Sequence, residues 1–159
     1  MRFEEWISTV PVEISGDPIW QLEVYRFALF AADIGWRDVL VLRRNPLTQS
    51  VADQLYRALG SISANLTEGY SRSKGADRAH FFEYSLGSAR ESRDWYYKSR
   101  VVLSTEIVRH RLGLPTAIVG MLASLISHQR IHALRESEAP YLVTTPSLDF
   151  NIDGEVPLP

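Results

Sequence analysis

The chain has 159 residues, a formal net charge of −2 at pH 7 and no cysteine. This length suits a single domain with a core of its own. The lack of cysteine excludes a disulfide framework, cysteine-ligated zinc, iron–sulfur clusters and a cysteine nucleophile. No uncharged apolar run of about 18 residues occurs, so no transmembrane helix is expected. The N-terminus lacks a basic and then apolar leader, and we expect a soluble, cytoplasmic protein.

The first helix is expected to follow an irregular N-terminal extension, residues 1–17. Asp17 and Pro18 then have the order of an N-cap and a proline at the first helical position, where the missing N–H costs nothing. Apolar residues recur from there at spacings of three and four, which predicts a helix to about Arg43. Pro46 ends it, because the residue before a proline avoids the α region.

Three further periodic segments predict helices at about 48–69, 76–102 and 105–135. Pro115 lies inside the last of these, so we expect a kink or a short break there. Residues 137–159 contain four prolines and are expected to be an extended or disordered acidic tail. Long helices joined by short links predict an all-α fold, an antiparallel up-and-down four-helix bundle over residues 18–136 with irregular extensions at both ends.

The apolar faces of these helices are wider than a strict coiled-coil seam requires. The third helix carries Trp95, Tyr96 and Tyr97 in succession, and three consecutive helical residues cannot all face one core. Surplus aromatic surface is typical of protein contacts. The breadth of these faces therefore predicts self-association, although long side chains and the two extensions could also cover them.

Charge is segregated along the chain. Residues 1–17 have a net charge of −3, residues 18–135 of +6 and residues 136–159 of −5. A basic middle between acidic ends can favour polyanions or acidic partners on one face. An ordinary solvated surface explains the same pattern, and the acidic ends could fold back on the basic surface.

Candidate catalytic chemistry is sparse. His128 and His132 are four residues apart on a predicted helix, the spacing of a two-histidine metal ligand pair. No glutamate follows His128 and no third ligand is evident, so neither a metal nor a cofactor is expected. The sequence contains no phosphate-binding glycine loop and no Gly-x-Ser-x-Gly nucleophile motif. We therefore expect a protein that is not an enzyme, with a metal-dependent helical enzyme as the weakest alternative.

Polar side chains of the second helix recur at spacings of three and four beside its apolar stripe. Buried polar groups need partners, so this spacing predicts a hydrogen-bonded network between helices that fixes their register. The predicted members are Gln54, Arg57, Ser61, Asn65 and Glu68, with Glu91 on the third helix.

The same stretch resembles the signature of the four helix bundle protein family, also known as the ribosomal-RNA intervening-sequence protein family. Its pattern is approximately Gln-Leu-x-Arg-Ala-x-x-Ser-Ile-x-Ala-Asn-Ile-x-Glu-Gly, which is similar to the sequence between Gln54 and Gly69. A second matching block runs from Phe82 to Arg100 and includes Leu86-Gly87-Ser88-Ala89-Arg90-Glu91-Ser92. The resemblance covers about residues 19–135.

This resemblance implies a left-handed antiparallel bundle, a ring-like homopentamer, and a binding or scaffolding role without catalysis. One relative, the accessory variability determinant of diversity-generating retroelements, binds a reverse transcriptase and nucleic acid through a basic surface. The implied partners are therefore RNA or DNA, a reverse transcriptase or another protein, and no membrane.

These observations favour an oligomeric adaptor that binds nucleic acid, or an enzyme acting on it, through a basic helical surface. The cations would contact phosphates rather than read bases. A module that binds only proteins, or only itself, is the alternative. The candidate nucleic-acid-binding residues are Arg72, Lys74, Arg78, Arg90, Arg93, Lys98 and Arg100.

Overall fold

The computed structural model describes residues 1–135, with side chains up to Ile131, and the predicted tail at 137–159 lies outside this part of the chain. The regular structure of the described residues is entirely helical, which confirms the predicted all-α class. The α-helices are α1 (Phe3–Ile7), α2 (Val12–Ser15), α3 (Glu23–Arg43), α4 (Gln49–Tyr70), α5 (Gly75–Lys98) and α6 (Thr105–Arg135). Three short 3₁₀ helices are η1 (Pro18–Gln21), η2 (Pro46–Thr48) and η3 (Ser99–Val101).

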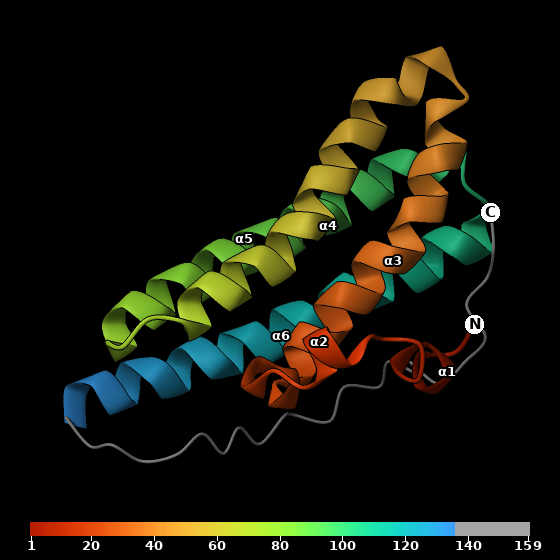
Figure 1. The fold of residues 1–159 in the computed structure, drawn as a ribbon. Coiled ribbons are helices and arrows are strands. Elements are labelled where there is room, and N and C mark those ends of the chain that lie inside the picture. The colour runs from red at the N-terminus through yellow and green to blue at the C-terminus, as the bar shows by residue number, and fades with distance from the viewer. Residues whose placement is uncertain (136–159) are drawn as a thin grey trace.

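Four long helices make up most of the molecule. Each of α3, α4 and α5 packs against the helix that follows it, and α3 also packs against α6. Figure 1 shows the chain reversing direction between α3 and α4 at the top, and again between α4 and α5 at the lower left. Every long helix therefore contacts its neighbour in sequence, and α6 brings the chain back to α3.

The first predicted helix begins with a short 3₁₀ helix rather than with an α-helical turn. Asp17 accepts a hydrogen bond from the Ile19 N–H at 2.9 Å, and Pro18 is the first helical residue, as predicted. This cap begins the 3₁₀ helix η1, and the extended backbone of Leu22 separates η1 from α3. The other three predicted helices agree with α4, α5 and α6 to within a few residues.

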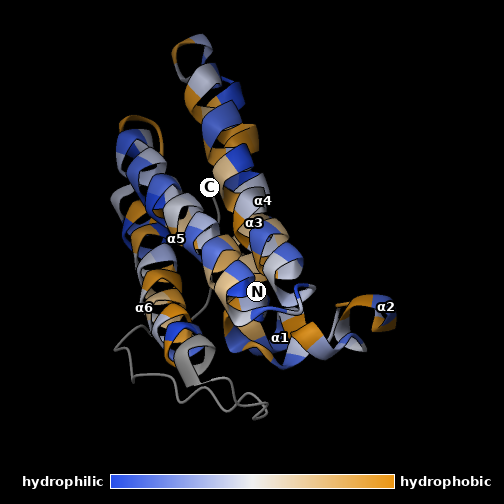
Figure 2. Cartoon of the chain, turned by 90° about the vertical axis from the view of Figure 1, so that its left-hand side faces the viewer, coloured by the Kyte–Doolittle hydropathy of each residue, from blue (hydrophilic) through white to orange (hydrophobic). Residues whose placement is uncertain are grey.

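The helix α6 continues through Pro115, so of the expected kink or short break the described chain does not contain the break. The segment Thr105–Ile131 is long and apolar enough to cross a membrane by length and composition alone. Half of its most apolar window is buried inside the protein, and the core helix of a water-soluble domain has these same properties. Figure 2 shows more hydrophobic residues along α6 than along α5.

The expectation of an irregular N-terminal extension is wrong. Residues 1–17 contain the helices α1 and α2, and α1 buries Phe3 and Trp6 in the core. The Phe3 ring meets Phe27 and Phe30 of α3 edge-on, at centroid distances of 5.0 and 5.3 Å. A helix of one turn is too short to show periodicity in the sequence, and it is held here by aromatic packing on α3.

The three successive aromatic residues of α5 point in different directions, as their spacing requires. Tyr96 is 1% exposed, Tyr97 is 53% exposed, and Trp95 is partly buried. Tyr97 leaves the core because consecutive helical residues are about 100° apart. Surplus aromatic surface is therefore present on α5.

Gly69 allows α4 and α5 to approach closely near their connection. A Cβ at this position would lie 2.9 Å from the Phe81 Cβ and 2.8 Å from the Phe82 Cε1. The Phe81 Cβ is fixed to the backbone, so only a shift of one helix could relieve the contact. Gly87 lies in the middle of α5 and has no such neighbour within 4 Å.

Gly69→Ala is expected to destabilise the fold by about 1–3 kcal/mol, because the added methyl group overpacks this helix contact. Gly87→Ala is the matched control and should stabilise it by about 0.5–1 kcal/mol, through helix propensity alone. Urea unfolding followed by circular dichroism measures both effects. Equal stability of the two variants would contradict the assigned role of Gly69.

Candidate nucleic-acid interface

Three long helices meet at a buried polar centre formed by Asp38, Tyr96 and Arg111. The side chains of Asp38 and Arg111 are 0% and 1% exposed. The Arg111 Nε donates to the Asp38 Oδ2 at 2.6 Å, and its Nη2 donates to the Oδ1 at 3.3 Å. The Tyr96 hydroxyl donates to the same Oδ2 at 3.0 Å. One carboxylate of α3 therefore connects α5 and α6.

Gly35 makes room for this centre. A Cβ on Gly35 would lie 2.9 Å from the Tyr96 hydroxyl oxygen and 2.3 Å from the Leu59 Cδ1. One turn of α3 thus provides both the carboxylate and the space that lets the tyrosine reach it. Sequence reasoning did not identify this centre. The available signal was a charged residue inside an apolar stripe, since Asp38 lies four residues from both Ile34 and Leu42.

Burial dominates the electrostatics of the centre. Burial raises the pKa of Asp38, while the hydrogen bonds from Arg111 and Tyr96 oppose that rise. Burial also raises the pKa of Tyr96 well above its ordinary value, and the nearby Asp38 carboxylate adds to this. The two-point contact with Arg111 favours the carboxylate form of Asp38. Tyr96 therefore stays a neutral hydrogen-bond donor. The negative charge of Asp38 and the positive charge of Arg111 neutralise each other inside the core.

Asp38→Asn is expected to destabilise the protein by about 3–5 kcal/mol, because it leaves the Arg111 charge buried without a counter-ion. The double variant Asp38→Leu/Arg111→Met removes both charges and should cost less than Asp38→Asn alone. Chemical unfolding of the two variants and the wild type tests this. A double variant less stable than Asp38→Asn would show that packing, rather than charge, dominates here.

His110 borders the buried pair. Its Nδ1 lies 2.9 Å from the Arg111 Nη1, and a guanidinium group can only donate. The Nδ1 therefore accepts, and the ring is neutral with its proton on Nε2. Burial first, and the Arg111 charge second, lower the pKa of His110 from 6.5 to about 4.

The low pKa of His110 predicts a loss of stability in mild acid. Between pH 6.5 and about 4 the unfolded chain binds a proton at this residue that the folded chain does not bind. The free energy of unfolding should therefore fall as pH falls through this range. His110→Asn keeps an acceptor but does not titrate, so its unfolding free energy should depend less on pH between 7 and 5. Parallel pH profiles for the two proteins would contradict the assignment.

The structure does not bring the predicted polar network together. Asn65 donates to the Ser61 carbonyl of its own helix, Glu68 pairs with Arg72, and Glu91 accepts from the Trp95 indole. Within residues 1–131 none of these bonds joins two long helices. A buried polar contact between α4 and α5 comes instead from Ser85, whose hydroxyl donates to the Ile62 carbonyl at 2.8 Å.

The candidate cations at the α4–α5 connection are largely engaged by their own chain. Arg72 pairs with Glu68 and lies over the Phe81 ring at 4.6 Å, and Arg78 donates to the Arg72 carbonyl at 2.7 Å. Lys74 is exposed and has no ion-pair partner among residues 1–131. Arg72 and Arg78 therefore shape this connection, whereas the Lys74 ammonium is open to solvent.

The remaining candidates follow α5 but do not form one cluster. Lys98 pairs with Asp94 and lies over the Trp95 ring, while Arg100 lies over the Tyr97 ring at 4.0 Å. Arg90 and Arg93 form no ion pair within the described chain. Arg90 is seven residues from Glu83, which pairs with Arg130 of α6, so Arg90 lies on the α6 side of α5.

The structure describes only one of the two histidines proposed as a metal pair, because the side chain of His132 lies beyond Ile131. Among the residues whose side chains are described, no three His, Asp or Glu side chains gather as metal ligands would.

Comparison with known proteins identifies one family. Residues 40–122 match the family described as 23S rRNA-intervening sequence protein, and this span includes both sequence blocks that resemble it. No curated protein and no solved structure matches the chain. The match covers α4, α5 and the first half of α6, but not α1 or most of α3. The protein belongs to the 23S rRNA-intervening sequence protein family.

Proposed function

We propose that the protein is a non-enzymatic scaffold that binds nucleic acid, or an enzyme acting on nucleic acid, through cations distributed along α5 and at its N-cap, which we call the α5 surface. The observation that carries the proposal is the set of cations along α5 that their own chain leaves uncompensated. Lys74, Arg90 and Arg93 have no ion-pair partner among residues 1–131. Cations in this state are free to contact phosphates without first breaking an internal pair.

The proposed scaffold is an antiparallel up-and-down four-helix bundle in a homo-oligomer, with the family resemblance favouring a pentamer. Short connections reverse the chain between consecutive long helices, and α3 packs against α6, which supports the bundle. Exposed apolar side chains such as Tyr97 and Val101 supply surface that a neighbouring copy could cover. Repetition of the basic surface around an oligomer would raise its affinity for a polyanion.

The uncompensated cations predict a salt-sensitive complex. Lys74→Gln/Arg90→Gln/Arg93→Gln should weaken binding to duplex DNA, and the slope of log affinity against log salt should become shallower by about 0.9 for each phosphate that the variant no longer neutralises. Fluorescence anisotropy at several salt concentrations measures both quantities. Light scattering coupled to size exclusion, with absorbance at 260 and 280 nm, reports oligomer mass and co-purifying nucleic acid.

Arg2→Gln is the control, because Arg2 lies on the N-terminal segment and pairs with Glu5. It changes the net charge by one but should leave the salt slope unchanged. An unaltered salt slope in the triple variant, with the fold intact by circular dichroism, would remove the α5 surface as the binding site. A protein partner bound with no dependence on salt would instead favour a module that binds only proteins.

A further inference from the structure

A second surface, separate from the α5 cations, lies across α3 and α4. At its centre are Trp36 of α3 and Tyr56 of α4, which are 47% and 50% exposed. Their ring centroids are 5.3 Å apart and their planes are inclined by 59°. At this inclination neither ring fully covers the face of the other. Two large aromatic rings are therefore held in place with much of their area open to solvent.

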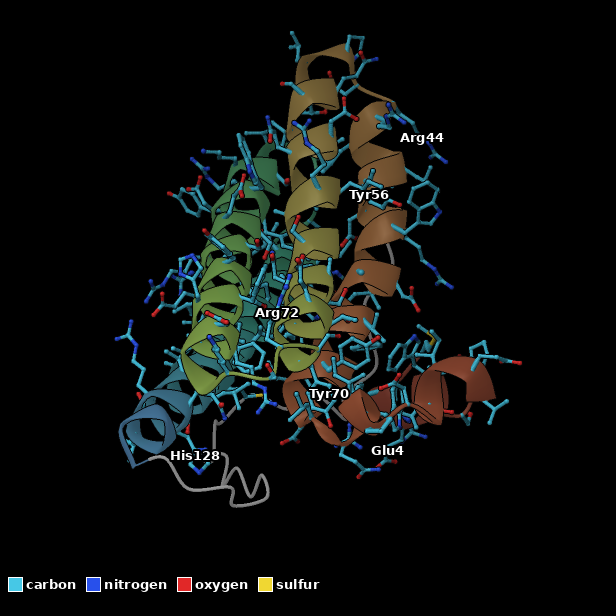
Figure 3. All side chains as sticks on the ribbon, turned by 60° about the vertical axis from the view of Figure 1, so that its left-hand side comes forward. Glu4, Arg44, Tyr56, Tyr70, Arg72 and His128 are labelled. Atoms are coloured by element: carbon cyan, nitrogen blue, oxygen red, sulfur yellow. The ribbon has the colours of Figure 1, made fainter. Side chains whose placement is uncertain are left out.

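Arginines flank this aromatic pair on both helices. Arg37 follows Trp36 and Arg57 follows Tyr56, while Arg44 lies seven residues after Arg37 on the same side of α3. All three are exposed and have no ion-pair partner among residues 1–131. Figure 3 shows Arg44 and Tyr56 on the upper part of the α3–α4 pair, away from Arg72. We call Trp36, Tyr56, Arg37, Arg44 and Arg57 the α3–α4 surface.

The carboxylates of this region, Asp53 and Asp33, already interact with other side chains of the chain. Asp53 of α4 pairs with Arg43 of α3 at 3.2 Å. Asp33 accepts a hydrogen bond from the Trp6 indole at 2.6 Å. The first contact joins α4 to α3, and the second joins α1 to α3. The three flanking guanidinium groups are left without a counter-ion from the described chain.

This combination has a specific chemical complement. Exposed rings stack on unpaired bases, and adjacent cations follow the phosphate backbone. A duplex buries the faces of its bases in its own stack. Its phosphates could contact the arginines, but its bases could not stack on the aromatic rings. Two copies of the chain docked here about a two-fold axis would bring like charges together and desolvate them at a cost. The surface therefore favours a flexible polyanion that carries its own aromatic faces.

We propose that the α3–α4 surface binds single-stranded nucleic acid by stacking unpaired bases on Trp36 and Tyr56, with Arg37, Arg44 and Arg57 contacting the flanking phosphates. This site is distinct from the proposed α5 surface, and it gives the protein a second class of ligand, single-stranded nucleic acid. The α5 cations bind phosphates of either strand form, whereas the α3–α4 surface selects strands whose bases are unpaired.

The test compares the full chain with Trp36→Leu/Tyr56→Leu, which keeps apolar cover over the helix seam but removes the ring faces. Binding is measured by fluorescence anisotropy with an oligothymidylate of about a dozen nucleotides and with its duplex with oligoadenylate. The double variant should bind the single strand at least about tenfold more weakly and the duplex as the wild type does. Arg37→Gln/Arg57→Gln should weaken binding of the single strand and reduce its salt dependence.

Tyr84→Leu is the matched control, since Tyr84 of α5 is 52% exposed and its ring contacts His80 rather than an arginine. It should leave the ratio of single-strand to duplex affinity unchanged, because Tyr84 lies outside the α3–α4 surface. Circular dichroism and light scattering establish that each variant keeps its fold and oligomeric mass. The inference is overturned if the wild type binds no oligothymidylate, if the double variant loses duplex and single strand equally, or if it changes oligomeric mass.

The outcomes separate this inference from the proposed function. Loss of single-strand binding in Trp36→Leu/Tyr56→Leu, with no effect of the triple α5 variant on either ligand, would uphold the α3–α4 surface and remove the α5 surface. The reverse pattern, with the triple α5 variant weakening both ligands and the aromatic variant neither, would keep the proposed function and reject the second site.

Discussion

The contact between Asp38 and Arg111 constrains the rest of the structure. Two charged groups buried in a helical core are unfavourable unless each satisfies the other. Their two-point hydrogen bonding therefore restricts how α3 and α6 can lie against one another. The Tyr96 hydroxyl adds α5 to this restriction, and Gly35 is the position whose missing side chain lets the tyrosine enter. The hydrogen-bond geometry at this one point thus specifies the register of α3, α5 and α6. Apolar packing alone specifies such a register only weakly.

The fourth long helix is positioned by different means. Contact between α4 and α5 depends on the space at Gly69 and on the hydrogen bond from Ser85 to a carbonyl of α4. Contact between α3 and α4 adds the pair of Arg43 and Asp53 at the surface, which contributes little energy because both groups are solvated. Within residues 1–131 the core is therefore specified by the buried pair of Asp38 and Arg111 and by a few close approaches, while surface charges remain available for other roles. The uncompensated cations of α5 and of the α3–α4 surface are consistent with that division.

The family match and the core do not have the same limits. Residues 40–122 match the family, yet Asp38 and the aromatic residues of α1 lie before that span and belong to the same core. Arg111 and Tyr96 lie within the match, so the buried pair joins the matched part of the chain to the part that precedes it. The N-terminal segment is therefore an integral part of this protein's core, and its aromatic residues complete the packing of α3.

The sequence alone determined the long helices α4, α5 and α6, because helical periodicity, proline positions and caps are local properties. The limits of α4, α5 and α6 follow from the apolar stripes and from Pro46, and both family blocks are readable without a structure. The sequence also indicated that Trp95, Tyr96 and Tyr97 could not share one core, which follows from helix geometry alone.

Only the tertiary structure decided which polar groups meet. Spacing placed Gln54, Ser61 and Asn65 on one side of α4 and suggested a network between helices. The structure instead pairs Asp38 with a residue 73 positions away. Residue spacing shows which side chains share one face of a helix. It does not show which residues of another helix pack against that face. The same limit explains why Trp36 and Tyr56, and the arginines beside them, were not recognised as one surface until α3 and α4 were packed together.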